Sequence, residues 1–123
     1  MDLICERSTL RGEVDIPGSK SHTIRAVAIA ALAEGESVIR QPLESKDAEA
    51  CVAAYTAFGA EMALTPEFWR VQGIGGEVRT PENVIDVGNS GTSLRIAMGS
   101  AALLRAGAAV LTGDAQIRKR PGG

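Results

Sequence analysis

The sequence predicts an α/β fold of one domain's size. Short strand-like segments alternate with longer helix-like segments along all 123 residues. Nineteen alanines lie mostly in three helical segments, where small side chains allow close packing. The hydrophobic content of 45% is sufficient for a buried core.

The first predicted elements lead into an amphipathic helix. Residues 2–6 and 11–16 are strand-like, and Pro17-Gly18 closes the second segment. We expect a helix from Lys20 to Ala33, with Gly35 just beyond its end. Its apolar residues recur three and four positions apart, as one buried face requires: Ile24, Val27, Ala28, Ala31 and Leu32.

The later elements alternate between strand and helix. We expect strands over residues 37–41, 61–64, 68–72, 84–87 and 109–111, and helices over 46–58 and 92–104. Asp47 and Glu49 fall in the first turn of the second helix, where carboxylates favour the positive end of the helix dipole. Thr65-Pro66-Glu67 forms the turn of a predicted hairpin.

The composition excludes several classes of protein. A net charge of −2 and only four aromatic residues argue against a general nucleic-acid binder. No apolar run approaches the roughly 20 residues of a membrane span, and no secretory leader is visible, so we expect a cytoplasmic protein. Two distant cysteines, Cys5 and Cys51, and one histidine, His22, are too few for a zinc site.

A first candidate anion site is the turn Pro17-Gly18-Ser19-Lys20-Ser21, which opens the first helix. Free backbone N–H groups at a helix start attract anions, and Lys20 adds a full charge. Ser21 and Arg25 are four residues apart and share a helix face. The alternative is an ordinary capped helix start exposed to solvent.

Two further candidates lie later in the chain. The turn Gly88-Asn89-Ser90-Gly91-Thr92 precedes a helix carrying Arg95, and its glycines allow a ligand to approach the backbone. The alternative is a tight turn in which Asn89 or Ser90 caps the helix. The cations of Arg118-Lys119-Arg120 could contact the same anion, or could form a solvated basic tail that continues through residues 121–123.

Nucleophilic catalysis has little support in this sequence. His22 follows Ser21 directly, and neighbouring residues on a helix point in different directions. We therefore expect His22 on the helix surface. Asp47 and Asp114 could act as acid or base, although each also suits a helix's first turn or a loop.

Three motifs together resemble one enzyme family. "PGSKS" followed by Arg25, "GNSGTSLR" over 88–95 and "LTGDAQIRKRP" over 111–121 occur in order, with "LAEGESVIRQPLESKD" between the first two. They are similar to the N-terminal part of 5-enolpyruvylshikimate-3-phosphate synthase, or 3-phosphoshikimate 1-carboxyvinyltransferase. The resemblance covers nearly the whole chain.

The resemblance implies an activity in the shikimate pathway of aromatic amino acid biosynthesis. This transferase moves the enolpyruvyl group of phosphoenolpyruvate to the 5-hydroxyl of shikimate 3-phosphate and releases phosphate, and glyphosate inhibits it. The reaction proceeds by addition and elimination, without a metal or organic cofactor. Because both substrates carry a phosphate and a carboxylate, the site needs cations and backbone donors.

The resemblance also implies a fold of two domains built from βαβαββ units, an inside-out α/β barrel with the substrates between the domains. Residues 1–17 would be strands of the second domain, and residues 18–123 an incomplete first domain. The chain would then be an N-terminal fragment that needs the remainder of the enzyme, and we expect it to be inactive alone.

The family's functional residues carry over by motif. Lys20 is implied to contact both substrates and to assist proton transfer, while Ser21 and Arg25 hold shikimate 3-phosphate, with Arg25 on its carboxylate. Gly91 brings its backbone to phosphoenolpyruvate, and Arg120 binds that substrate's phosphate. The supporting residues implied by the same motifs are Asn89, Thr92, Arg95 and Asp47.

Some positions depart from the family pattern. Lys46 replaces an acidic neighbour of Asp47, Ile24 stands where asparagine is common, and Ser90 stands where alanine is frequent. The related UDP-N-acetylglucosamine enolpyruvyl transferase normally has Lys-Asn at Lys20-Ser21 and a cysteine near residues 115–118, so it remains the minor alternative. A non-catalytic anion-binding fragment is the other.

Overall fold

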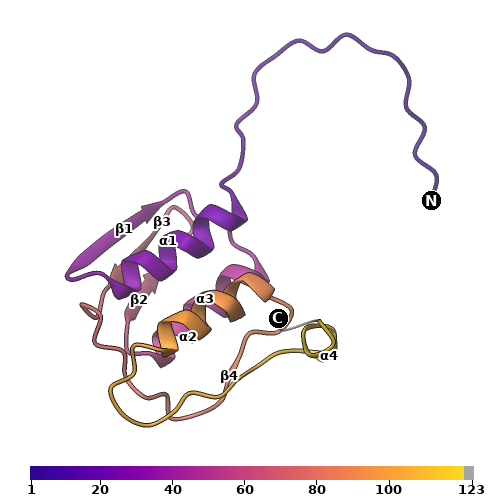
Figure 1. The fold of residues 1–123 in the computed structure, drawn as a ribbon. Coiled ribbons are helices and arrows are strands. Elements are labelled where there is room, and N and C mark those ends of the chain that lie inside the picture. Colours follow the sequence, from indigo (N-terminus) through magenta and orange to yellow (C-terminus); the bar gives the residue numbers. More distant parts are fainter. Residues whose placement is uncertain (121–123) are drawn as a thin grey trace.

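Three helices pack between a three-stranded antiparallel sheet and a short parallel strand pair in the computed structural model, which describes residues 1–120 (Figure 1). The elements in chain order are α1 (Lys20–Leu32), β1 (Glu36–Arg40), α2 (Lys46–Ala57), β2 (Glu61–Leu64), β3 (Phe68–Gln72), β4 (Ile85–Asp86), α3 (Gly91–Ala101), β5 (Leu111–Thr112) and α4 (Ala115–Arg118). The predicted α/β class is confirmed.

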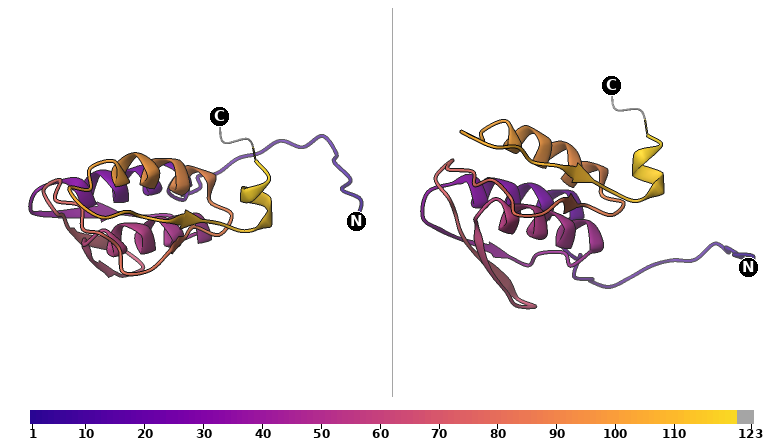
Figure 2. Two further views of the ribbon diagram at one scale, coloured as in Figure 1. Left: turned by 60° about the horizontal axis from the view of Figure 1, so that its bottom comes forward. Right: turned by 90° about the horizontal axis from the view of Figure 1, so that it is seen from below.

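The larger sheet has the order β1-β3-β2, and β4 pairs with β5 in parallel. From α1 to β3 the order is α-β-α-β-β, which is the expected βαβαββ unit without its first strand. A β-α-β segment from β4 to β5 follows. Figure 2 shows the helices stacked in layers beside the sheet.

The predicted elements from residue 20 onward are confirmed within three residues at nearly every boundary. Both strands of the predicted hairpin match β2 and β3 residue for residue. The last strand begins two residues later than predicted, and α4 was not predicted at all. The tail predicted at 119–123 is described only as far as Arg120; residues 121–123 lie outside the described part.

The predicted strands over residues 2–6 and 11–16 are wrong for this structure. Residues 1–17 form no strand and extend away from the helices, and their apolar side chains are exposed (Figure 1). The alternation of apolar and polar residues is genuine, but a strand needs a neighbour for its backbone hydrogen bonds. The described part of the chain offers these residues no neighbouring strand.

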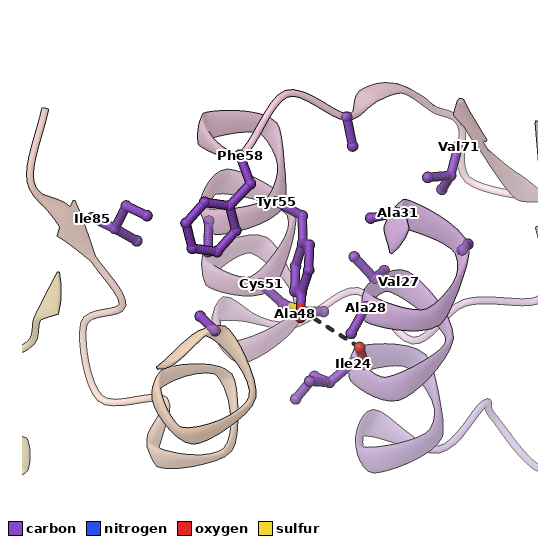
Figure 3. Packing of buried hydrophobic residues seen from close by; sticks show 14 of the residues in the cluster. Ile24, Val27, Ala28, Ala31, Ala48, Cys51, Tyr55, Phe58, Val71 and Ile85 are labelled. Atoms are coloured by element: carbon purple, nitrogen blue, oxygen red, sulfur yellow. Dashed lines mark hydrogen bonds between the residues drawn. The ribbon is translucent and has the colours of Figure 1, made fainter. Parts of the chain in front are cut away.

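The core lies where the sheet meets the helices. On β3, Trp69 and Val71 point toward the helices while Arg70 and Gln72 are exposed, the alternation expected of a half-buried strand. Tyr55 of α2 and Phe58, which caps the end of that helix, meet edge to face with ring centroids 5.8 Å apart (Figure 3). Both rings are fully buried.

Two buried polar contacts tie the helices together. The Cys51 thiol of α2 donates to the Ile24 carbonyl of α1 at 3.5 Å (Figure 3). The Tyr55 hydroxyl meets Ser100 Oγ of α3 at 2.6 Å. Because Ser100 Oγ donates its own proton to the Ile96 carbonyl, Tyr55 is the donor of that pair.

The loop after β3 closes the end of α1. Backbone N–H groups of Ile74, Gly75 and Gly76 donate to carbonyls of α1 and its cap, Ala31, Ala33 and Leu32, at 2.8–2.9 Å. These are the orphan acceptors that every helix leaves at its C-terminus. Within residues 1–120, no helix has the length and apolar character needed to cross a membrane.

Candidate functional site

A cleft of about 790 Å³ opens where the first turns of α1, α2 and α3 meet the end of α4. Most of the residues singled out from the sequence line it. The lining residues are Lys20, Asp47, Asn89, Gly91, Thr92, Leu94, Arg95, Met98, Ile117 and Arg120.

Lys20 enters the cleft from the first turn of α1. Ser19 caps that helix, its hydroxyl accepting from the His22 N–H at 3.4 Å. The Lys20 ammonium pairs with the Asp47 carboxylate, Nζ to Oδ2, at 2.7 Å. Both side chains stay partly accessible, at 51% and 27%, so the pair can still meet a ligand.

Asp47 is held by a chain of serines at the start of α3. Ser90 caps α3 and donates from its hydroxyl to Ser93 Oγ at 2.7 Å. Ser93 Oγ in turn donates to the Asp47 carbonyl at 2.9 Å. Ser90 and Ser93 are both only 1% exposed, so this contact fixes the start of α2 against the start of α3.

Arg120 reaches the cleft from beyond α4. Its Nη2 donates to Asn89 Oδ1 at 3.1 Å, which joins the basic segment to the turn before α3. A Cβ on Gly91 would lie 3.2 Å from Arg120 Nη1, so glycine leaves room for the guanidinium. Two motifs that are 31 residues apart in the sequence therefore form one wall.

One face of α3 also lines the cleft. Thr92 and Arg95, three residues apart, both line the cleft, as their predicted shared face requires. Leu94, Met98 and Ile117 add apolar surface to the lining.

Two predicted ligand residues lie outside this lining. Ser21 and Arg25 are exposed on α1, where Arg25 Nη1 donates to the Ser21 carbonyl at 3.0 Å. Of the three consecutive cations, Arg120 lines the cleft, whereas Arg118 and Lys119 do not. His22 is exposed on the helix surface, as predicted.

The charge of the cleft suits an anion. The lining contains three cations, Lys20 of α1, Arg95 of α3 and Arg120 beyond α4, and one carboxylate, Asp47. No group of three or more metal-ligating side chains occurs within residues 1–120. Asp114 takes a structural place, capping α4 through bonds of 2.9 Å from the N–H groups of Gln116 and Ile117.

Buried titratable groups lie in the core, outside the cleft lining. Burial raises the pKa of the Cys51 thiol to about 12, although a hydrogen bond with Ser93 opposes the shift. Burial also raises the pKa of Tyr55. Neither group is poised to ionise near neutral pH, so neither suits nucleophilic or acid–base work.

Several site residues were missed from the sequence. Leu94, Met98 and Ile117 follow the apolar spacing of their helices and carry no separate signal. Gln116, whose Oε1 accepts from Asn89 Nδ2 at 2.7 Å, lies in a segment for which the sequence predicted no element. Only the three-dimensional structure brings it beside the turn before α3.

Comparison with known proteins identifies a family match over nearly the whole chain. Residues 4–122 match the sequence profile described as EPSP synthase (3-phosphoshikimate 1-carboxyvinyltransferase). The chain is 53% identical over 120 residues to the 3-phosphoshikimate 1-carboxyvinyltransferase of Ruminiclostridium cellulolyticum. It is 52% identical over 117 residues to that of Methanothrix thermoacetophila.

A solved structure gives the same result for the fold. The EPSP synthase from Acinetobacter baumannii superimposes with a TM-score of 0.80 at 31% identity, over 89% of this chain and 25% of that one. The alignments with the two relatives cover 98% and 95% of this chain but only 28% and 27% of theirs. The chain thus spans little more than a quarter of the length of these proteins.

Proposed function

The chain belongs to the EPSP synthase (3-phosphoshikimate 1-carboxyvinyltransferase) family, as its N-terminal portion, and on that premise we propose that its cleft binds phosphoenolpyruvate and shikimate 3-phosphate. In this proposal the cleft is one wall of an active site that transfers the enolpyruvyl group to the 5-hydroxyl of shikimate 3-phosphate and releases phosphate. The observation that carries it is the meeting of Lys20, Arg95 and Arg120 in one cleft.

Phosphoenolpyruvate is assigned to the Gly91 side of the cleft. Arg120 offers a guanidinium fork for the phosphate, and glycine at position 91 lets the ligand approach the first turn of α3. Lys20 also lines the cleft and is paired with Asp47. A lysine beside a carboxylate can exchange a proton with a reacting hydroxyl, which is the assisting role proposed for Lys20.

Shikimate 3-phosphate is assigned to the part of the cleft that Lys20 of α1 lines. Ser21 and Arg25 are exposed on the same helix as Lys20, so a ligand that touches Lys20 can extend to them. The Arg25 guanidinium, now bonded to the Ser21 carbonyl, would bind the substrate carboxylate.

Residues 1–17 belong to this proposal as well. Their alternating apolar side chains are exposed, including Leu3, Ile4, Val14 and Ile16, each at least 80% accessible. We propose that they pair as strands in the second domain, while residues 18–123 contribute to the first. Pairing there would satisfy the backbone groups and cover the apolar side chains.

Titration of the chain by NMR tests the binding proposal. Shikimate 3-phosphate should shift amides of residues 18–25 and 88–95, with weaker binding as salt rises, because exposed charges are screened. Arg25→Ala should weaken binding by about tenfold, the cost of one charge-assisted hydrogen bond. Arg70→Ala, which removes a cation paired with Glu36 on the sheet, is the matched control. Amides that do not shift would contradict the proposal.

A further inference from the structure

Gln116 lies just outside the cleft and contacts one of its lining residues. Asn89 Nδ2 donates to Gln116 Oε1 at 2.7 Å, and Arg120 Nη2 donates to Asn89 Oδ1 at 3.1 Å. The Asn89 amide thus bridges α4 to the guanidinium through its two ends. Gln116 itself is exposed and makes no contribution to the core.

The donors and acceptors permit only one arrangement of the hydrogen bonds that link Gln116, Asn89 and Arg120. A guanidinium has five N–H donors and no acceptor, so Asn89 must turn its oxygen toward Arg120. The Asn89 nitrogen then faces Gln116, which must present its own oxygen. Gln116 is placed by the cap of α4, because its backbone N–H donates to Asp114 Oδ1 at 2.9 Å.

The same contacts place Arg120 relative to Gly91. With Nη2 bonded to Asn89, Nη1 lies where a Cβ of residue 91 would be only 3.2 Å away. The guanidinium is therefore held at the first residue of α3, inside the cleft. Without this bond, a long exposed side chain would sample many rotamers.

We propose that Gln116 is a positioning residue for the anion site. Its side-chain oxygen orients the Asn89 amide, and the oriented amide holds the Arg120 guanidinium at Gly91. The contact geometry stands by itself, whereas the identity of the anion as phosphoenolpyruvate rests on the proposed function. Holding the guanidinium before the ligand arrives removes an ordering cost from binding.

Two substitutions of Gln116 distinguish the effect of its acceptor oxygen from the effect of its side-chain shape. Gln116→Met keeps a similar length and no charge but removes the amide, while Gln116→Glu keeps an acceptor oxygen facing Asn89. Gln72→Met makes the same change at an exposed residue of β3, away from the cleft, and serves as the control.

The first measurement needs no ligand. In the 123-residue chain, the Asn89 side-chain amide and the Arg120 guanidinium N–H resonances should shift in Gln116→Met and stay near their parent positions in Gln116→Glu and Gln72→Met. Unchanged resonances in Gln116→Met would overturn the positioning role, and so would shifts of equal size in Gln116→Met and Gln116→Glu.

The second measurement uses phosphoenolpyruvate, with inorganic phosphate as a second probe. Dissociation constants should rise about three- to tenfold in Gln116→Met and stay unchanged in Gln72→Met. Equal affinity of the parent and Gln116→Met would count against the inference. If the parent binds neither probe, the proposed function fails, and the side-chain resonances still decide whether Gln116 positions Arg120.

Discussion

At the scale of single residues, Gly91 leaves space for the Arg120 guanidinium in the cleft. One possible reason for glycine at a turn is that it adopts a left-handed conformation easily. That reason does not apply to Gly91, which has no positive φ and is the first residue of α3. What it avoids is a Cβ near the Arg120 guanidinium, at 3.2 Å from Nη1, and near Ile117 Cδ1, at 3.7 Å. Space, not backbone strain, explains glycine at this position.

In the proposed function, glyphosate occupies the phosphoenolpyruvate space beside Gly91 and is the longer of the two ligands. Gly91→Ala should therefore reduce glyphosate binding more than phosphoenolpyruvate binding and leave shikimate 3-phosphate largely unaffected. The affinities are measured in a full-length chimaera that carries this chain in place of the matching segment of the Ruminiclostridium cellulolyticum relative. Gly99→Ala is the control, because a Cβ there meets nothing within 4 Å on the same helix. Equal losses for glyphosate and phosphoenolpyruvate would contradict the steric argument.

The two cysteines should differ sharply in reactivity. Cys5 is exposed, whereas Cys51 is buried with its pKa raised to about 12, so iodoacetamide at pH 8.5 should modify Cys5 alone until the chain is unfolded. Peptide mass mapping measures this. Rapid alkylation of Cys51 in the folded chain would contradict its burial.

The raised pKa of Cys51 also gives a pH dependence of stability. The unfolded thiol ionises near its ordinary pKa of 9.0 while the folded thiol stays protonated, so the unfolded state binds fewer protons above pH 9. The free energy of unfolding should therefore fall as pH rises from 9 toward 12. In Cys51→Ala, urea denaturation should show a smaller fall over this range.

At the scale of elements, the end of α1 is decided by a distant loop. Gly35 was expected close beyond the helix, and it has a positive φ of 82°, but the helix already ends at Leu32. The carbonyls left open at that end are bonded by backbone N–H groups of residues 74–76. Gly73 allows this approach, because a Cβ there would overlap the Ala33 carbonyl and lie 2.5 Å from the Ala30 carbonyl oxygen.

Gly73→Ala should lower the free energy of unfolding by about 2–3 kcal/mol, since the methyl group would push the loop from α1. Urea denaturation measures the change. Gly99→Ala should instead leave stability unchanged or raise it by up to about 1 kcal/mol, because its Cβ meets open space inside a helix. A stability for Gly73→Ala within 0.5 kcal/mol of the parent, roughly the range of neutral surface changes, would disprove the close approach.

At the scale of the whole molecule, the cleft is one part of a larger proposed site. The chain spans 28% of its Ruminiclostridium cellulolyticum relative, and three cations line its cleft. In the proposed function this cleft contributes to a site for two substrates that each bear a phosphate and a carboxylate. Transfer between two substrates requires both to be held in one geometry. We expect that a chain of little more than a quarter of its relative's length does not hold both in that geometry by itself.

The 123-residue chain alone should therefore release phosphate from phosphoenolpyruvate and shikimate 3-phosphate only at the background rate. A phosphate-release assay measures this, and the full-length chimaera supplies the positive control. Clear turnover by the isolated chain would show that the remainder of the family's sequence is dispensable.

The local elements were predictable because their signals are local. Apolar spacing of three and four residues marked α1, and a turn of Thr65-Pro66-Glu67 between two alternating segments marked the β2–β3 hairpin. The family resemblance, not local patterning, predicted that Lys20, Gly91 and Arg120 lie together, and all three line one cleft.

Other features depend on contacts between distant residues, and only the tertiary structure decided them. Residues 1–17 read as strands, yet they form none, because pairing needs a neighbour that residues 18–120 do not provide. The carbonyls at the end of α1 are bonded by a loop more than 40 residues further along the chain, and the role of Gln116 depends on its contact with Asn89. Sequence periodicity reports which face a residue prefers to bury, whereas partners far along the chain are chosen by packing and hydrogen bonding in three dimensions.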